Sequence, residues 1–138
     1  MASSRVYNAI FQHLTAAVAP DRVMDYDDID DTVTQGQDQF IILEEDFSDR
    51  QTVAFGGGHL CQRETAVFTV QCMVPSPQSS PTARAYGDTV RDLIVALKSP
   101  DLRLLNISPP TVEKMNDGLW TAAFLDVEIE ADYYVVTP

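Results

Sequence analysis

The stretch that decides the fold is Glu64 to Lys98, which reads ETAVFTVQCMVPSPQSSPTARAYGDTVRDLIVALK. Apolar and polar residues alternate from Glu64 to Val74, and this alternation predicts a long strand with one buried face. The Pro- and Ser-rich segment 75–81 predicts a loop. From Thr82 to Lys98 the apolar residues recur every three or four positions, which predicts an amphipathic helix. The stretch therefore indicates an α+β domain.

The same pattern predicts which side chains form the core. On the strand, one face carries Ala66, Phe68, Val70, Cys72 and Val74, and the other carries mostly Arg63, Thr65, Thr69 and Gln71. On the helix, the buried stripe comprises Ala83, Tyr86, Gly87, Val90, Leu93, Ile94 and Leu97. We expect the two apolar sets to pack against each other, because each needs an apolar partner.

A first helix precedes this stretch. Ser3 or Ser4 supplies its N-cap, apolar residues recur at helical spacing as far as about Ala19, and Pro20 ends the pattern. The following segment, Asp25 to Asp31, is too charged and turn-prone to form a packed element.

Several further segments predict strands. The candidates are residues 39–45, 52–55, 102–107 and 111–115, with a flexible reversal at Gly56-Gly57-Gly58 and a hairpin turn at Asn116-Asp117-Gly118 before a long final strand. The element order is then α-β-β-β-α-β-β. We expect a mainly antiparallel sheet of about four to five strands with two packed helices, and at 138 residues a single domain spanning residues 1–138.

The final strand has two different faces. The core face carries Leu119, Thr121, Ala123, Leu125, Val127 and Ile129. The other face begins with Trp120, Ala122 and Phe124 and continues with Asp126, Glu128, Glu130 and Asp132. These acids must share a face and repel one another. Their row is either an ordinary solvated sheet face or a surface that symmetry repeats around a pore.

The chain is strongly acidic, with a formal net charge of −12. This argues against a protein that grips nucleic acid, because such proteins neutralise phosphates with Lys and Arg. Residues 21–50 hold eleven acids against only Arg22 and Arg50. The eleven are Asp21, Asp25, Asp27, Asp28, Asp30, Asp31, Asp38, Glu44, Glu45, Asp46 and Asp49.

The two cysteines and the apolar segments bear on the compartment. Cys61 and Cys72 lie on one predicted strand, roughly 36 Å apart and on opposite faces, so they cannot pair with each other. No run of about 18 apolar residues predicts a membrane span. Ala17-Val18-Ala19 imitates a signal-peptide cleavage site, but polar residues interrupt the apolar segment before it. We expect reduced thiols, a retained first helix and an intracellular protein.

No catalytic, cofactor or metal site is expected. A calcium loop drawn through Asp25 and Asp27 would place Asp30 where glycine is required. Gly56-Gly57-Gly58-His59 lacks the Gly-Lys-Ser/Thr of a phosphate loop. His59 and Cys61 could begin a zinc site, but no further His or Cys is spaced to complete it. His13 is best explained as a helix-surface or interface histidine.

The layout resembles the tail terminator (tail completion) proteins of tailed bacteriophages. The residues that carry the resemblance are Val6-Tyr7-Asn8-Ala9-Ile10-Phe11, Ala66-Val67-Phe68-Thr69-Val70, Pro81-Thr82-Ala83-Arg84-Ala85-Tyr86-Gly87-Asp88 with Val90-Arg91-Asp92-Leu93, and Gly118-Leu119-Trp120. The resemblance implies a structural, non-enzymatic virion protein made in the host cytoplasm. It implies a homo-hexameric ring that caps the tail tube and joins it to the head-side connector. DNA would then pass through the acidic ring without specific binding.

Two alternatives stay open. One is a monomeric acidic inhibitor that mimics DNA and occupies the binding site of a basic protein. The Trp120–Ala122–Phe124 face and the long hairpin favour assembly over that inhibitor. The other is an adaptor or stopper from the same phage neck, which differs in its ring position. The sequence does not distinguish a contractile from a non-contractile tail.

Overall fold

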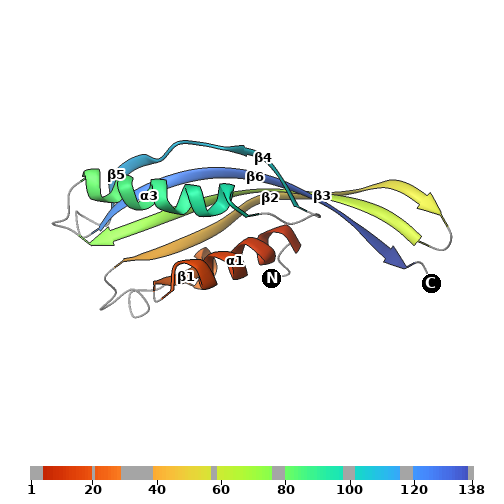
Figure 1. Cartoon of the computed structure of the whole chain (residues 1–138), viewed down its shortest axis with the longest axis horizontal. Helices are drawn as coiled ribbons and strands as arrows, with labels where there is room; N and C mark the ends of the chain where they lie inside the picture. The colour runs from red at the N-terminus through yellow and green to blue at the C-terminus, as the bar shows by residue number, and fades with distance from the viewer. Residues whose placement is uncertain are drawn as a thin grey trace.

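The computed structural model places two helices on one face of a six-stranded sheet (Figure 1). It describes residues 5–19, 21–28, 39–56, 59–75, 80–97, 102–115 and 120–136. The expected α+β class, with a mainly antiparallel sheet and two packed helices, is confirmed.

The elements follow the order α-β-β-β-α-β-β-β, which has one more strand after the second helix than the expected order, and the sheet has six strands in place of the expected four to five. The helices are α1 (Arg5–Ala17) and α3 (Ser80–Val95), and a short 3-10 helix η1 (Tyr26–Asp28) lies after the first strand. The strands are β1 (Arg22–Asp25), β2 (Phe40–Gly56), β3 (His59–Pro75), β4 (Leu102–Ile107), β5 (Thr111–Met115) and β6 (Trp120–Val136). Their spatial order is β1-β2-β3-β6-β4, with β5 also beside β6, and only the β1–β2 pair is parallel.

Two strands differ from the sequence-based expectation. The segments 39–45 and 52–55 belong to one continuous strand, β2, which passes through a bulge near Asp46. Strand β1 was not predicted, because only Val23 and Met24 are buried in its four residues. It pairs with β2 next to the acidic segment, and the charge there concealed the short apolar run.

The main core lies between the helices and the sheet. The predicted inward residues of β3, from Ala66 to Val74, are all buried, and so are Val90 and Ile94 of α3. Helix α1 adds Val6, Tyr7, Ile10 and Leu14. Gly87 lies where α3 packs closely against the sheet: a Cβ atom there would lie 2.8 Å from the Cβ of Ala123 on β6. A glycine in mid-helix is therefore explained by a close approach.

A second, smaller apolar cluster lies on the opposite face of the sheet. It contains Met24, Phe40, Ile42, Met73 and Ala122, with Trp120 and Phe124 packed against it. The rings of Phe40 and Trp120 meet edge to face, with centroids 4.9 Å apart. Ala122 is fully buried within the chain, and Trp120 and Phe124 are partly buried. That these three residues favour assembly stays a prediction.

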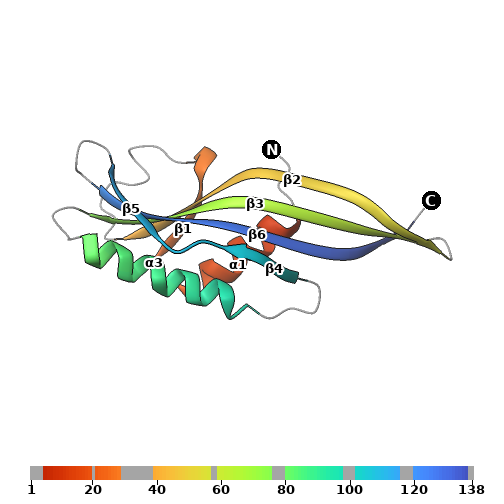
Figure 2. The same cartoon turned by 90° about the horizontal axis from the view of Figure 1, so that it is seen from above.

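Three strands extend beyond the helices as a ribbon, which we call the arm. Strands β2, β3 and β6 each have 17 residues, or about 55 Å of extended chain. Strand β4 pairs with β6 only as far as Ala131, which lies in one row with Glu64 and Arg50. From this row towards Gly56, His59 and Val136, the described residues pair only among β2, β3 and β6. Figures 1 and 2 both show the arm projecting from the end of the helical layer, with the end of β6 near its tip.

Candidate functional site

The acidic row of β6 lies on the sheet face turned away from the helices. Its residues alternate with the buried Leu125, Val127 and Ile129, as the sequence pattern predicts. The register places Asp126 beside Thr69 of β3, Glu128 beside Val67 and Glu130 beside Thr65. We call this surface the outer face.

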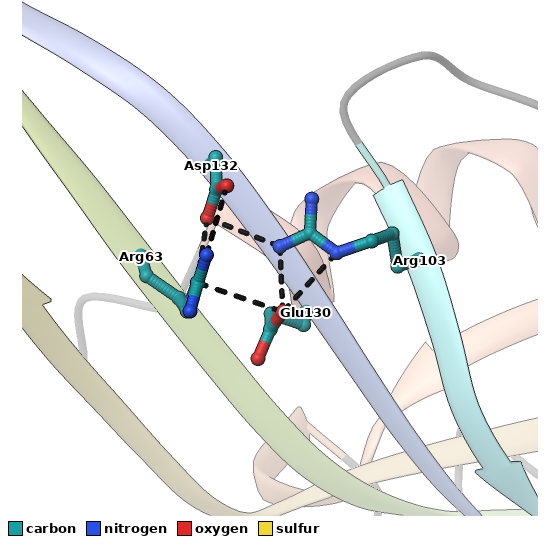
Figure 3. A network of polar contacts seen from close by, with 4 residues as sticks. All are labelled: Arg63, Arg103, Glu130 and Asp132. Carbon is teal, nitrogen blue, oxygen red and sulfur yellow. Dashed lines mark hydrogen bonds and ion pairs between the residues drawn. The ribbon is translucent and has the colours of Figure 1, made fainter. Parts of the chain in front are cut away.

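Two arginines from neighbouring strands bind one end of this row (Figure 3). Arg63 of β3 donates from Nε to Oδ1 of Asp132 at 3.0 Å and from Nη2 to Oδ2 at 3.4 Å. Arg103 of β4 donates from Nε and Nη2 to Oε1 of Glu130, at 3.1 and 2.6 Å. Cross contacts close the network, with Arg103 Nη2 at 3.1 Å from Asp132 Oδ1 and Arg63 Nε at 3.6 Å from Glu130 Oε1.

This network corrects the expected electrostatics of the acidic row. Glu130 and Asp132 do not simply repel each other, because two guanidinium groups lie against them. Hydrogen bonds from Arg63 and Arg103 hold the pKa of Asp132 below its ordinary value. The same carboxylates raise the pKa of both arginines. Sequence reasoning missed the network because Arg63 precedes Asp132 by 69 positions, and only the strand register brings them together.

The other end of the row remains acidic. The hydroxyl of Thr69 donates to Oδ2 of Asp46 at 2.7 Å and lies 3.4 Å from Oδ1 of Asp126. Among the described residues, no basic side chain forms an ion pair with Asp46, Asp126 or Glu128. Nearby, desolvation and then the charges of Asp46 and Asp27 raise the pKa of Glu44. This part of the outer face is a region of unbalanced negative charge.

Glu64 is a charged residue at an inward position of β3. Its side chain is 1 % exposed, and Oε1 accepts the backbone N–H of Val6 at 3.1 Å. Its other oxygen accepts Nη2 of Arg50 at 3.1 Å. The carboxylate thus satisfies a free N–H in the first turn of α1 and sits at the positive end of that helix. A charged residue in phase with Ala66 and Phe68 was the signal that sequence reasoning overlooked.

Asp25, at the start of the aspartate cluster, is held by a tyrosine of α1. The hydroxyl of Tyr7 donates to Oδ2 of Asp25, and it also lies 3.0 Å from the carbonyl oxygen of Leu43. Burial and the Asp25 carboxylate raise the pKa of Tyr7. Oδ1 of Asp25 accepts the backbone N–H of Asp27. Asp30 and Asp31, the remainder of the expected acidic loop, lie outside the described residues.

A second tyrosine binds Asp21 just before β1. Tyr86 of α3 donates to Oδ2 of Asp21 at 3.1 Å, and the side-chain amide of Gln39 donates to the same oxygen at 2.7 Å. Burial and then the charge of Asp21 raise the pKa of Tyr86. Each helix therefore contributes one tyrosine that ties the β1 region to the body of the protein.

The remaining candidates for chemistry are placed as follows. His13 lies between the helices, with Nε2 at 3.0 Å from the carbonyl oxygen of Leu93, as expected of an interface histidine. Cys61 and Cys72 are both free thiols, as expected. His59 lies at the start of β3, but its side chain is outside the described set. Within the described ranges no group of three or more His, Cys, Asp or Glu could hold a metal ion.

No helix in the described part of the chain is long and apolar enough to cross a membrane. No protein-family model matches the chain, and no curated protein matches it significantly.

Proposed function

We propose that this protein is the subunit of a ring that closes the tail tube of a tailed bacteriophage and joins it to the head-side connector. The observation that carries the proposal is the unbalanced acidic region of the outer face, around Asp46, Asp126 and Glu128. If the outer face, which is turned away from the helices, lines the central pore of the ring, its negative charge would repel the phosphate backbone. DNA could then slide through the pore without being bound.

The arrangement of layers supports this orientation. Both helices cover the opposite face of the sheet, so they would form the outside of such a ring (Figure 2). The arm would reach along the ring axis or towards a neighbour, where the tail tube protein or the connector binds. The resemblance of the sequence segments named above to tail terminators favours the same assignment. The ring would be hexameric when assembled and would have no catalytic role.

The test reverses the charge of the region that would line the lumen. We expect Asp126→Lys with Glu128→Lys to leave the fold intact, because both side chains lie on the outer face and neither pairs with a described base. Particles assembled with this variant should contain normal tails but deliver less DNA, because phosphates would bind the lumen. Glu130 is left unchanged, since Arg103 binds it.

A matched control reverses two exposed acids on the helical side. Asp88→Lys with Asp92→Lys on α3 makes the same change in net charge, and DNA delivery should be unaffected. Equal impairment by both variants would mean that net charge, and not the outer face, matters. A protein that stays monomeric by native mass spectrometry even with tail tubes present would end the proposal.

The inhibitor that mimics DNA is less well supported. Such a protein needs a continuous acidic surface, and Arg63 and Arg103 interrupt this one. An adaptor or stopper ring in the same neck has the same chemistry. Its position would be separated from that of a terminator by images of assembled particles.

A further inference from the structure

The sheet has two open edges among the described residues. Strand β1 covers β2 only from Phe40 to Leu43, so the edge of β2 from Glu44 to Gly56 has no described strand beside it. At the opposite side, β4 is the last strand, paired only with β6. Unpaired edges are places where another chain can dock, and proteins normally shield them.

Each open edge exposes large apolar side chains. Phe47 on β2 is 58 % exposed, and on β4 Leu104 and Leu105 are 38 % and 48 % exposed. All three lie at irregularities of the strands, because the register shifts between Glu45 and Phe47 and again between Leu104 and Asn106. Of the five large apolar residues that are exposed in the described chain, three therefore lie on these two edges.

The two edges stand at the same level of the sheet. Asn106 of β4 pairs with Glu128 of β6, Glu128 pairs with Val67 of β3, and Val67 pairs with Phe47 of β2. Asn106 and Phe47 therefore lie in the same row across the sheet. In the same way, Arg103 of β4 and Asp49 of β2 lie in one row, joined by the paired residues Glu130 and Thr65. Two copies placed side by side in the same orientation would thus bring β4 of one against β2 of the next without a shift along the strands.

The charges of the two sides are complementary. On the side of β1 and β2, the described acids are Asp21, Asp25, Asp27, Asp28, Glu44, Glu45, Asp46 and Asp49, against Arg22 and Arg50. On the side of α3, β4 and β5, the described bases are Arg84, Arg91, Arg103 and Lys114, against Asp88, Asp92 and Glu113. Arg103 uses Nε and Nη2 in the network with Glu130 and Asp132, and its Nη1 bonds to no other described residue.

We propose that a second copy of this chain occupies these edges in a head-to-tail contact, with β2 of one copy against β4 of its neighbour. Phe47 packs beside Leu105, which lies in the β4 bulge next to Asn106, and Asp49 faces Arg103. The paired strands run antiparallel, since β2, β3, β6 and β4 alternate in direction. The bulges limit a continuous hydrogen-bonded ladder, so side chains carry much of the contact. The inference rests on the proposed ring only for closure of the contact into a ring.

Cross-linking between cysteines tests this contact. In a Cys61→Ser background, Ser48→Cys and Asn106→Cys place thiols on the two edges without altering the residues that make the contact. With a short bis-maleimide at high protein concentration, the chain carrying both cysteines should give a ladder of covalent oligomers. Each single-cysteine chain should stay monomeric, because across the contact position 48 lies one residue along the strand from the level of position 106, within reach of the cross-linker, whereas neither position lies near its own copy. Adding Phe47→Asp should abolish the ladder while circular dichroism stays unchanged.

The control pairs Ser48→Cys with Thr89→Cys on the exposed surface of α3, and it should give no ladder. Absence of a ladder from the edge pair, a ladder of equal strength from the control pair, or dimers from Ser48→Cys alone would overturn the inference. Cross-linking of the β2 edge to another protein, without any link between two copies of this chain, would also overturn the inference.

The cross-linking result and the proposed phage function can fail independently of each other. A ladder with no ring on tail tubes would retain the contact and reject the phage role. Rings seen on tail tubes without the 48–106 link would retain the role and reject this contact.

Discussion

Replacement of Gly87 by alanine tests how closely α3 approaches the sheet. The new Cβ would lie 2.8 Å from the Cβ of Ala123 and 3.1 and 3.2 Å from two ring carbons of Pro110. Overpacking of this kind costs about 1–3 kcal/mol. Alanine in place of glycine in a helix interior raises the free energy of unfolding by about 1 kcal/mol, because alanine has the higher helix propensity. We expect a net loss of about 1 kcal/mol in the free energy of unfolding, measured by urea denaturation.

Two further variants separate the contributions. Ala85→Gly on the exposed face of α3 measures helix propensity alone and should cost about 1 kcal/mol. In an Ala123→Gly background the nearest clash is absent, so Gly87→Ala should be less destabilising there or even stabilising. If Gly87→Ala stabilises the parent protein by the full propensity difference, the helix does not approach the sheet as described and the reasoning is refuted.

Two predictions concern ionisable side chains. Because the folded pKa of Asp132 is depressed, its stabilising contribution is complete above its unfolded pKa and is lost as the pH falls through the folded pKa. The difference in unfolding free energy between the parent and Asp132→Asn should therefore shrink on acidification, and a difference that persists at the lowest pH would contradict this. Burial raises the pKa of Cys72 to about 12, so in native protein iodoacetamide should label Cys61 and spare Cys72. Rapid labelling of native Cys61→Ser protein would show that Cys72 is accessible.

The core was predictable because a period of two or of 3.6 assigns each residue to a face. The alternation around Phe68 is buried as expected, and the helical stripe through Val90 is buried except for Tyr86, Leu93 and Leu97, which are partly buried. The same rule placed the row from Asp126 to Asp132 on the outer face. These properties depend only on local geometry, so local sequence was sufficient.

The features that were missed depend on strand register or on few residues. The pairing of Arg63 with Asp132 needs the alignment of β3 with β6, which local patterns do not supply. Strand β1 has too few buried residues to produce a periodic signal. The open edges of β2 and β4 likewise follow from the strand order, which local periodicity does not determine.

The place of β6 in the sheet has a consequence for synthesis. This strand lies between β3 and β4, yet it follows every other described strand along the chain. While the ribosome is still making it, β3 has β2 on one side and a bare edge of apolar residues on the other. Pairings between distant segments also form slowly. We therefore expect the nascent protein to pass through an aggregation-prone stage, in which the acids of β2 favour solubility until β6 has paired.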